Sequence, residues 1–145
     1  MLGIDIICVG KLKEKFFIGA CEEYKKRLGA YCKLNIIEVA ETPASNDSEV
    51  RRALTAEAER IDAKIPKDAY LICMCIEGKM LSSETLCEKI SSLKCSGKSR
   101  LCFIIGGSNG IDESIKARAG LRLSMSPMTF PHHLARVMLL EQVYR

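Results

Sequence analysis

The chain has 145 residues, of which 48% are hydrophobic and 28% are charged, and its formal net charge is +4 at pH 7. This length predicts a single domain over residues 1–145, and the composition excludes a disordered chain because it can supply a packed core. The apolar start precedes the first lysine without a small-residue cleavage site, and no apolar run is long enough to cross a bilayer. We therefore expect a cytoplasmic protein with no membrane segment.

Hydrophobic periodicity alternates between the strand and the helix pattern along the chain. Strands are predicted at 4–9, 33–39, 69–76, 101–105 and 121–124, and helices at 16–28, 48–65, 82–94, 113–119 and 131–145. Asn46 and Glu49 form a capping signal for the second helix, and Pro66 closes that helix. Five strands alternating with helices predict an α/β fold with a parallel, helix-covered sheet.

Three loops at the carboxyl ends of predicted strands are candidate ligand sites, because the loops of such sheets gather at one edge. They cover residues 76–84, 106–112 and 124–131. Met125, Met128 and Phe130 make the last loop unusually apolar, and they either plug the core or line a pocket. Their position beside two glycine-containing loops favours a pocket wall.

The stretch FIIGGSNGID (103–112) runs from an apolar strand into three glycines. It is not a dinucleotide fingerprint, because Ile105 stands where the first glycine should be and the turn follows the fourth strand instead of the first. A Walker A motif is also absent, so a nucleotide-dependent oxidoreductase is nearly excluded. Main-chain amides together with apolar walls suit a flat, neutral group such as adenine.

Eight cysteines are present, and Cys8, Cys73, Cys75 and Cys102 lie in strand-like apolar runs, which favours buried, reduced thiols. The sequence has no paired Cys-x-x-Cys spacing, and its two histidines are adjacent, so we expect no metal site. Basic residues gather at 11–15, 25–27, 98–100 and 116–122. Each cluster alone is typical of a solvated surface, but together they could follow an RNA backbone.

The segments VGKLKEKFF, GKMLSSE, FIIGGSNGI and LSMSPMTFPHHLARVMLLEQVYR resemble the SPOUT-class methyltransferase H family, which modifies a pseudouridine in large-subunit ribosomal RNA. The similarity extends from Gly10 to Arg145. It implies S-adenosylmethionine as cofactor, a homodimer, and a carboxyl-terminal trefoil knot, which is an exception to the rule that chains do not thread loops. It also implies methylation at N3 of the pseudouridine in assembled ribosomes.

The resemblance also assigns cofactor contacts to individual residues. They are Met74 in the third strand, Gly106 in the glycine turn, and the loop residues Met125, Ser126, Pro127, Met128, Thr129 and Phe130. Pro127 stands where the family commonly has lysine. Members of the family continue past the position of Arg145 and end in Tyr-His-Lys, which closes over the substrate, so we expect full activity to need such a continuation.

By the same resemblance, Arg145 is the candidate catalytic residue that positions the substrate. The alternative is a surface ion pair with Glu141 at i,i+4 spacing, and the sequence leaves both open. His132 and His133 more often serve packing at a helix start. The last helix is apolar on several sides, which predicts contact with a second subunit. The competing function is a non-catalytic, ribosome-associated RNA-binding module, which binding of S-adenosylmethionine would distinguish.

Overall fold

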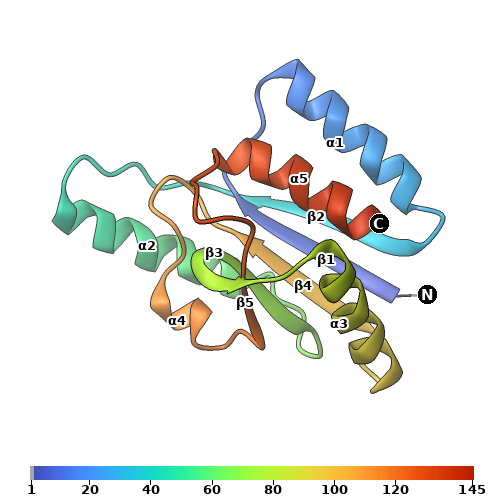
Figure 1. Cartoon of the computed structure of the whole chain (residues 1–145). Coiled ribbons are helices and arrows are strands. Elements are labelled where there is room, and N and C mark those ends of the chain that lie inside the picture. The colour runs from blue at the N-terminus through green and yellow to red at the C-terminus, as the bar shows by residue number, and fades with distance from the viewer. Residues whose placement is uncertain (1) are drawn as a thin grey trace.

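The computed structural model describes residues 2–145 and contains a five-stranded parallel sheet with helices on both faces (Figure 1). The strand order is β2-β1-β4-β3-β5, and all neighbouring strands are parallel. The elements in chain order are β1 (Leu2–Val9), α1 (Lys15–Leu28), β2 (Cys32–Val39), α2 (Asp47–Asp62), β3 (Tyr70–Met80), α3 (Ser83–Cys95), β4 (Arg100–Ile105), α4 (Glu113–Lys116), β5 (Leu121–Ser124) and α5 (His132–Tyr144). The predicted α/β class and parallel sheet are confirmed.

Two hydrophobic cores lie on the two faces of the sheet. Alternate residues of β1 supply both, since Ile6 packs in the core under α1, α3 and α5, and Ile7 packs in the core under α2 and α4. Leu139 of α5 belongs to the first core, and Ile61 and Ile115 belong to the second. Because β1 and β4 are covered on both faces, their sequences are nearly continuous apolar runs.

The predicted cap of α2 is confirmed. Asn46 precedes the helix in an extended conformation, and its side-chain Oδ1 accepts a hydrogen bond from the Glu49 amide at 3.0 Å. The Glu49 carboxylate in turn accepts from the Ser45 amide at 2.7 Å, so two amides at this helix start are paired. The helix ends at Asp62, before Pro66.

Strand β3 is longer than the predicted strand at 69–76. It continues to Met80, but its pairing with β5 is interrupted, because Met74 and Lys79 are both opposite Leu123. The residues between them form a bulge, which the strand periodicity could not reveal. Gly78 belongs to this bulge, where a Cβ atom would lie 2.7 Å from the Arg122 carbonyl oxygen.

Helix α5 packs on the sheet of its own chain beside α1 (Figure 1). Leu139 and Leu140 are 1% and 0% exposed, whereas Leu134 and Tyr144 remain exposed. Much of the apolar surface that predicted a second subunit is therefore buried within the protomer.

All eight cysteines are free in the part of the chain that the structure describes. Burial raises the pKa of Cys8, Cys73 and Cys102 to about 12, so these thiols stay protonated, while Cys75 is only partly buried. Within residues 2–145, none of the helices has the length and apolar character that a membrane crossing requires. The same residues contain no group of three or more His, Cys, Asp or Glu side chains placed to hold a metal ion.

Candidate functional site

A cavity of about 730 Å³ lies beside the bulge of β3 and the carboxyl ends of β4 and β5. Residues 74–77 of β3, the glycine turn after β4 and the apolar loop after β5 supply its walls. Its volume falls in the range of small-molecule and cofactor sites. The predicted ligand loops therefore meet at the carboxyl edge of the sheet, as the topology of a parallel sheet requires.

Most of the residues assigned to the cofactor line this one cavity: Met74, Gly106, Met125, Ser126, Met128, Thr129 and Phe130. Pro127 does not line it and is exposed. All three apolar loop residues line the cavity, which favours the pocket-wall interpretation. Met128 is exposed, whereas Met125 is partly buried and also packs against the first core. Met74 pairs with Ile105 on one side and with Leu123 on the other, so it lies in the middle of β3 beside the ends of β4 and β5.

The glycine turn is folded tightly on itself. A Cβ atom on Gly106 would lie 2.5 Å from the carbonyl oxygen of Gly110, and the amide of Gly110 donates to the carbonyl of Gly107 at 3.1 Å. Gly110 has φ of +86°, a left-handed conformation that favours glycine. Glycine is therefore required at position 106 by the tight packing of the turn itself. The main chain of this compact turn lies at the cavity wall.

Two hydrogen bonds fold the apolar loop. The Ser124 hydroxyl donates to the carbonyl of Ser126 at 3.1 Å, and the amide of Met128 donates to the Ser126 hydroxyl at 2.9 Å. Ser124 is buried at the end of β5, so the loop starts from a fixed point. Local side-chain bonds of this kind turn the chain without regular secondary structure, and here they bring Met125 and Met128 to the cavity wall.

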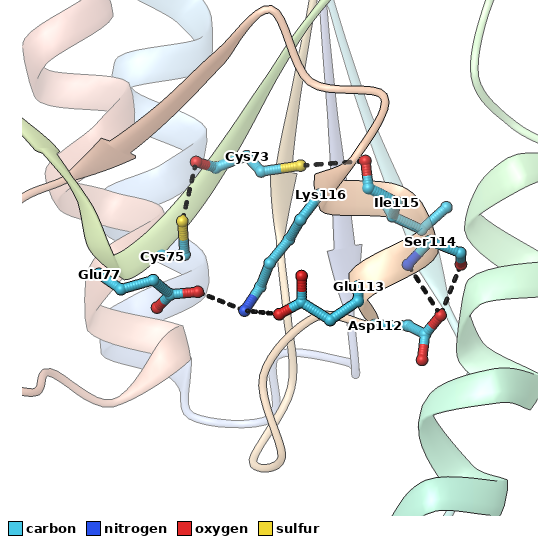
Figure 2. A network of polar contacts seen from close by, with 8 residues as sticks. All are labelled: Cys73, Cys75, Glu77, Asp112, Glu113, Ser114, Ile115 and Lys116. Atoms are coloured by element: carbon cyan, nitrogen blue, oxygen red, sulfur yellow. Dashed lines mark hydrogen bonds and ion pairs between the residues drawn. The ribbon is translucent and has the colours of Figure 1, made fainter.

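Glu77 and Lys116 are the two charged side chains among the cavity-lining residues that the structure describes. Lys116 contacts the carboxylate of Glu77 and lies 3.6 Å from that of Glu113 (Figure 2). Burial acts to lower the pKa of Lys116, but its contacts with these carboxylates outweigh burial and raise it. The hydrogen bond from Lys116 lowers the pKa of Glu77, so both groups are charged at neutral pH.

This pair was not predicted from the sequence. The sequence pattern puts Lys116 in a basic cluster suited to RNA, whereas in the structure the lysine is mostly buried against carboxylates. The sequence contains one signal for Glu77, which is its position directly after a predicted strand and within one of the three candidate ligand loops.

His132 lines both this cavity and a second one of about 660 Å³, which Gly10, Lys11, Lys13, Glu38, Val39, Ala40, Glu41 and His133 complete. Burial lowers the pKa of His132, the neighbouring His133 and Arg136 lower it further, and Glu41 opposes them. His132 is therefore neutral at pH 7. His133 packs near Phe17 and lies 3.9 Å from Glu14, in agreement with a packing role.

Arg145 lines neither cavity. Its guanidinium donates to Glu141 at 2.6 Å, with 63% of the arginine side chain exposed, so the structure contains the surface ion pair that the spacing allowed. Exposed pairs of this kind contribute about 0.2–1 kcal/mol to stability.

The fold and the cavity at the carboxyl edge of its sheet define an α/β protein whose cavity lies where ligands collect in parallel sheets. Residues 2–145 match a family described as "Predicted SPOUT methyltransferase". A protein of Bifidobacterium adolescentis named ribosomal RNA large subunit methyltransferase H is 52% identical over 145 residues, which cover 98% of this chain and 91% of the relative. A Bacillus pumilus protein of the same name is 48% identical, with 99% and 92% covered. The chain belongs to the SPOUT methyltransferases and, within them, to the ribosomal large-subunit methyltransferase H family.

Proposed function

We propose that the protein uses S-adenosylmethionine to methylate N3 of a pseudouridine in large-subunit ribosomal RNA, in assembled ribosomes. The observation that carries this proposal is the convergence of Met74, Gly106 and the loop 125–130, which are far apart in sequence, on one cavity. The names of the two relatives support ribosomal RNA as the substrate.

The lining of the cavity fits the proposed cofactor. Met125, Met128 and Phe130 offer apolar surface to an adenine ring, and the main chain of residues 106–111 lies beside them with polar groups for its edge. When bound, S-adenosylmethionine supplies a methyl group that its sulfonium already activates. The protein then has to hold the nucleophile in line with that group, and walls fixed by the strand ends suit this task.

The second cavity is the proposed approach of the target nucleotide. His132 lines both cavities, so the two adjoin, and Lys11 and Lys13 bring positive charge for a phosphate. Glu38 and Glu41 also line it, so the charge there is mixed. Weak, salt-sensitive binding of isolated RNA is the expected consequence.

We also propose that the protein is a homodimer with a carboxyl-terminal trefoil knot. Because Arg145 lines neither cavity of its own chain, a role in positioning substrate requires it to reach the site of a second subunit. The exposed Leu134 and Tyr144 on α5 support such a contact. An experimental structure traced continuously through residues 100–145 would check the threading of the knot.

A radiolabelled methyl assay tests the proposed reaction with ribosomes from a strain that lacks this protein. We expect labelling of assembled ribosomes that contain pseudouridine, little labelling of the same RNA stripped of protein, and less where uridine replaces pseudouridine. Equal labelling of naked RNA would contradict the assembled ribosome as substrate. Ribosome binding without any affinity for S-adenosylmethionine would instead support the RNA-binding module.

A further inference from the structure

Glu77 and Lys116 stand apart from the rest of the cavity lining. The other described lining residues are apolar, neutral polar or glycine, apart from His132, which is neutral at pH 7. Glu77 belongs to the bulge of β3 and Lys116 ends α4, so two separate elements bring one anion and one cation to the same wall. Figure 2 shows the two side chains directed toward each other across the space between these elements.

The burial of Lys116 distinguishes this contact from an ordinary surface ion pair. The Lys116 side chain is 13% exposed, whereas Glu77 and Glu113 are 49% and 77% exposed. Lys116 therefore carries its charge in a mostly desolvated position with two solvent-exposed carboxylates as partners. A third carboxylate, supplied by a ligand in the cavity, can replace one of them without leaving the lysine unpaired.

The chemistry of the pair matches one kind of ligand group. An α-amino acid end carries a carboxylate and an ammonium close together, and adenine and ribose carry no charge. We propose that Lys116 and Glu77 bind the zwitterionic α-amino acid end of the methyl donor, with Lys116 on its carboxylate and Glu77 on its ammonium group. This inference rests on the proposed function, and it makes the pair a determinant of cofactor specificity.

The competing role is structural, because the same contact could simply hold the β3 bulge against α4. Three ligands separate the two roles. S-Adenosylhomocysteine has the full amino acid end, its decarboxylated analogue keeps the amine and lacks the carboxylate, and 5′-methylthioadenosine lacks both.

Isothermal titration calorimetry measures the affinity of each ligand for the wild type and for Lys116→Met, Glu77→Gln and Glu113→Gln. Glu113→Gln is the matched control, since Glu113 contacts Lys116 but does not line the cavity.

We expect Lys116→Met to weaken S-adenosylhomocysteine by about tenfold or more, because a charge-assisted hydrogen bond is lost. Its affinities for the decarboxylated analogue and for 5′-methylthioadenosine should stay within about twofold of wild type. Glu77→Gln should weaken both amine-containing ligands and spare 5′-methylthioadenosine, and Glu113→Gln should leave all three unchanged.

Unchanged affinity for 5′-methylthioadenosine also shows that a variant is folded. An equal loss for all three ligands in Lys116→Met and Glu77→Gln would establish the structural role and overturn the inference. Unchanged binding of S-adenosylhomocysteine by both variants would overturn it as well. If the wild type binds none of the ligands, the proposed function itself fails, and the inference fails with it.

Discussion

At the scale of single residues, main-chain crowding explains the need for glycine at two positions near the cavity. Neither Gly78 nor Gly106 has a positive φ, so their backbone conformation would allow other residues. A Cβ atom at either position, however, would lie less than 3 Å from atoms of the neighbouring main chain. Gly106 lines the cavity where the turn after β4 begins, and Gly78 lies in the β3 bulge next to the lining residue Glu77.

Gly106→Ala should displace the turn and abolish binding of S-adenosylmethionine. The added Cβ would lie 2.5 Å from the Gly110 carbonyl, and overpacking of this kind costs about 1–3 kcal/mol. Calorimetric titration and thermal unfolding measure the two effects. Gly19→Ala is the control, because nothing lies within 4 Å of its Cβ and alanine favours the helix. Normal cofactor affinity in Gly106→Ala would show that the turn does not take part in cofactor binding.

The ion pair of Glu38 and Arg136 should make stability depend on acid pH. Burial acts to raise the pKa of Glu38, but hydrogen bonds from Arg136 and the Leu12 amide outweigh it and lower the pKa. A carboxylate with a lowered folded pKa stabilises above its unfolded value of about 4.3, and this stability is lost as pH falls through the folded pKa. Glu38→Gln should lower the free energy of unfolding, measured with urea, at pH 7. The further decrease of that free energy between neutral and acid pH should be smaller in this variant than in the wild type.

The matched variant for this measurement is Glu57→Gln. Burial raises the pKa of Glu57, so the stability that this group contributes is present below about pH 4.3 and declines as pH rises through its folded pKa. The two substitutions should therefore change the pH dependence of unfolding in opposite directions. The same direction of change in both would show that the Arg136 pair does not control the acid response.

At the scale of elements, every predicted helix and strand is present, and their ends differ by a few residues. The apolar runs at β1 and β4 made the central strands clear, because both faces of these strands are buried. The end of β3 was not predictable in this way. Its last residues, Lys79 and Met80, are exposed, so they lack the apolar pattern of a buried strand. They belong to the strand because they pair with β5, which lies more than forty residues further along the chain.

Asn46→Ala should destabilise the protein by about 1 kcal/mol, because the Glu49 amide loses its side-chain acceptor at the start of α2. Thermal unfolding of the variant measures this loss. Thr55→Ala, in the exposed middle of the same helix, serves as the control and should change stability by less than about 0.5 kcal/mol. Equal effects of both substitutions would show that the cap contributes nothing specific.

At the scale of the whole molecule, α5 has an inner side that is buried in the core and an outer side that is exposed. Leu139 and Leu140 fill the protomer core, so a charge at Leu139 would unfold the chain and could not report on association. The outer residues of the helix are the ones that a second subunit could cover.

We expect sedimentation at twice the chain mass of 16.1 kDa at micromolar concentration. Leu134→Glu should give a folded monomer, because Leu134 is 37% exposed on α5. Thr55→Glu, on α2 at the opposite face of the sheet, should remain dimeric. A wild-type protein that sediments as a monomer would contradict the proposed dimer.

The sequence by itself determined the α/β class, the order of elements, the cap of α2 and the loops that line the cavity, because periodicity, capping and turn chemistry act over a few neighbouring residues. Only the tertiary structure decided that Met74, Gly106 and the apolar loop share one cavity, since strand order brings β3, β4 and β5 together. It also decided that Arg145 pairs with Glu141 away from that cavity, and that Lys116 faces Glu77 inside it. Contacts of this kind join residues far apart in the chain, so no local pattern records them.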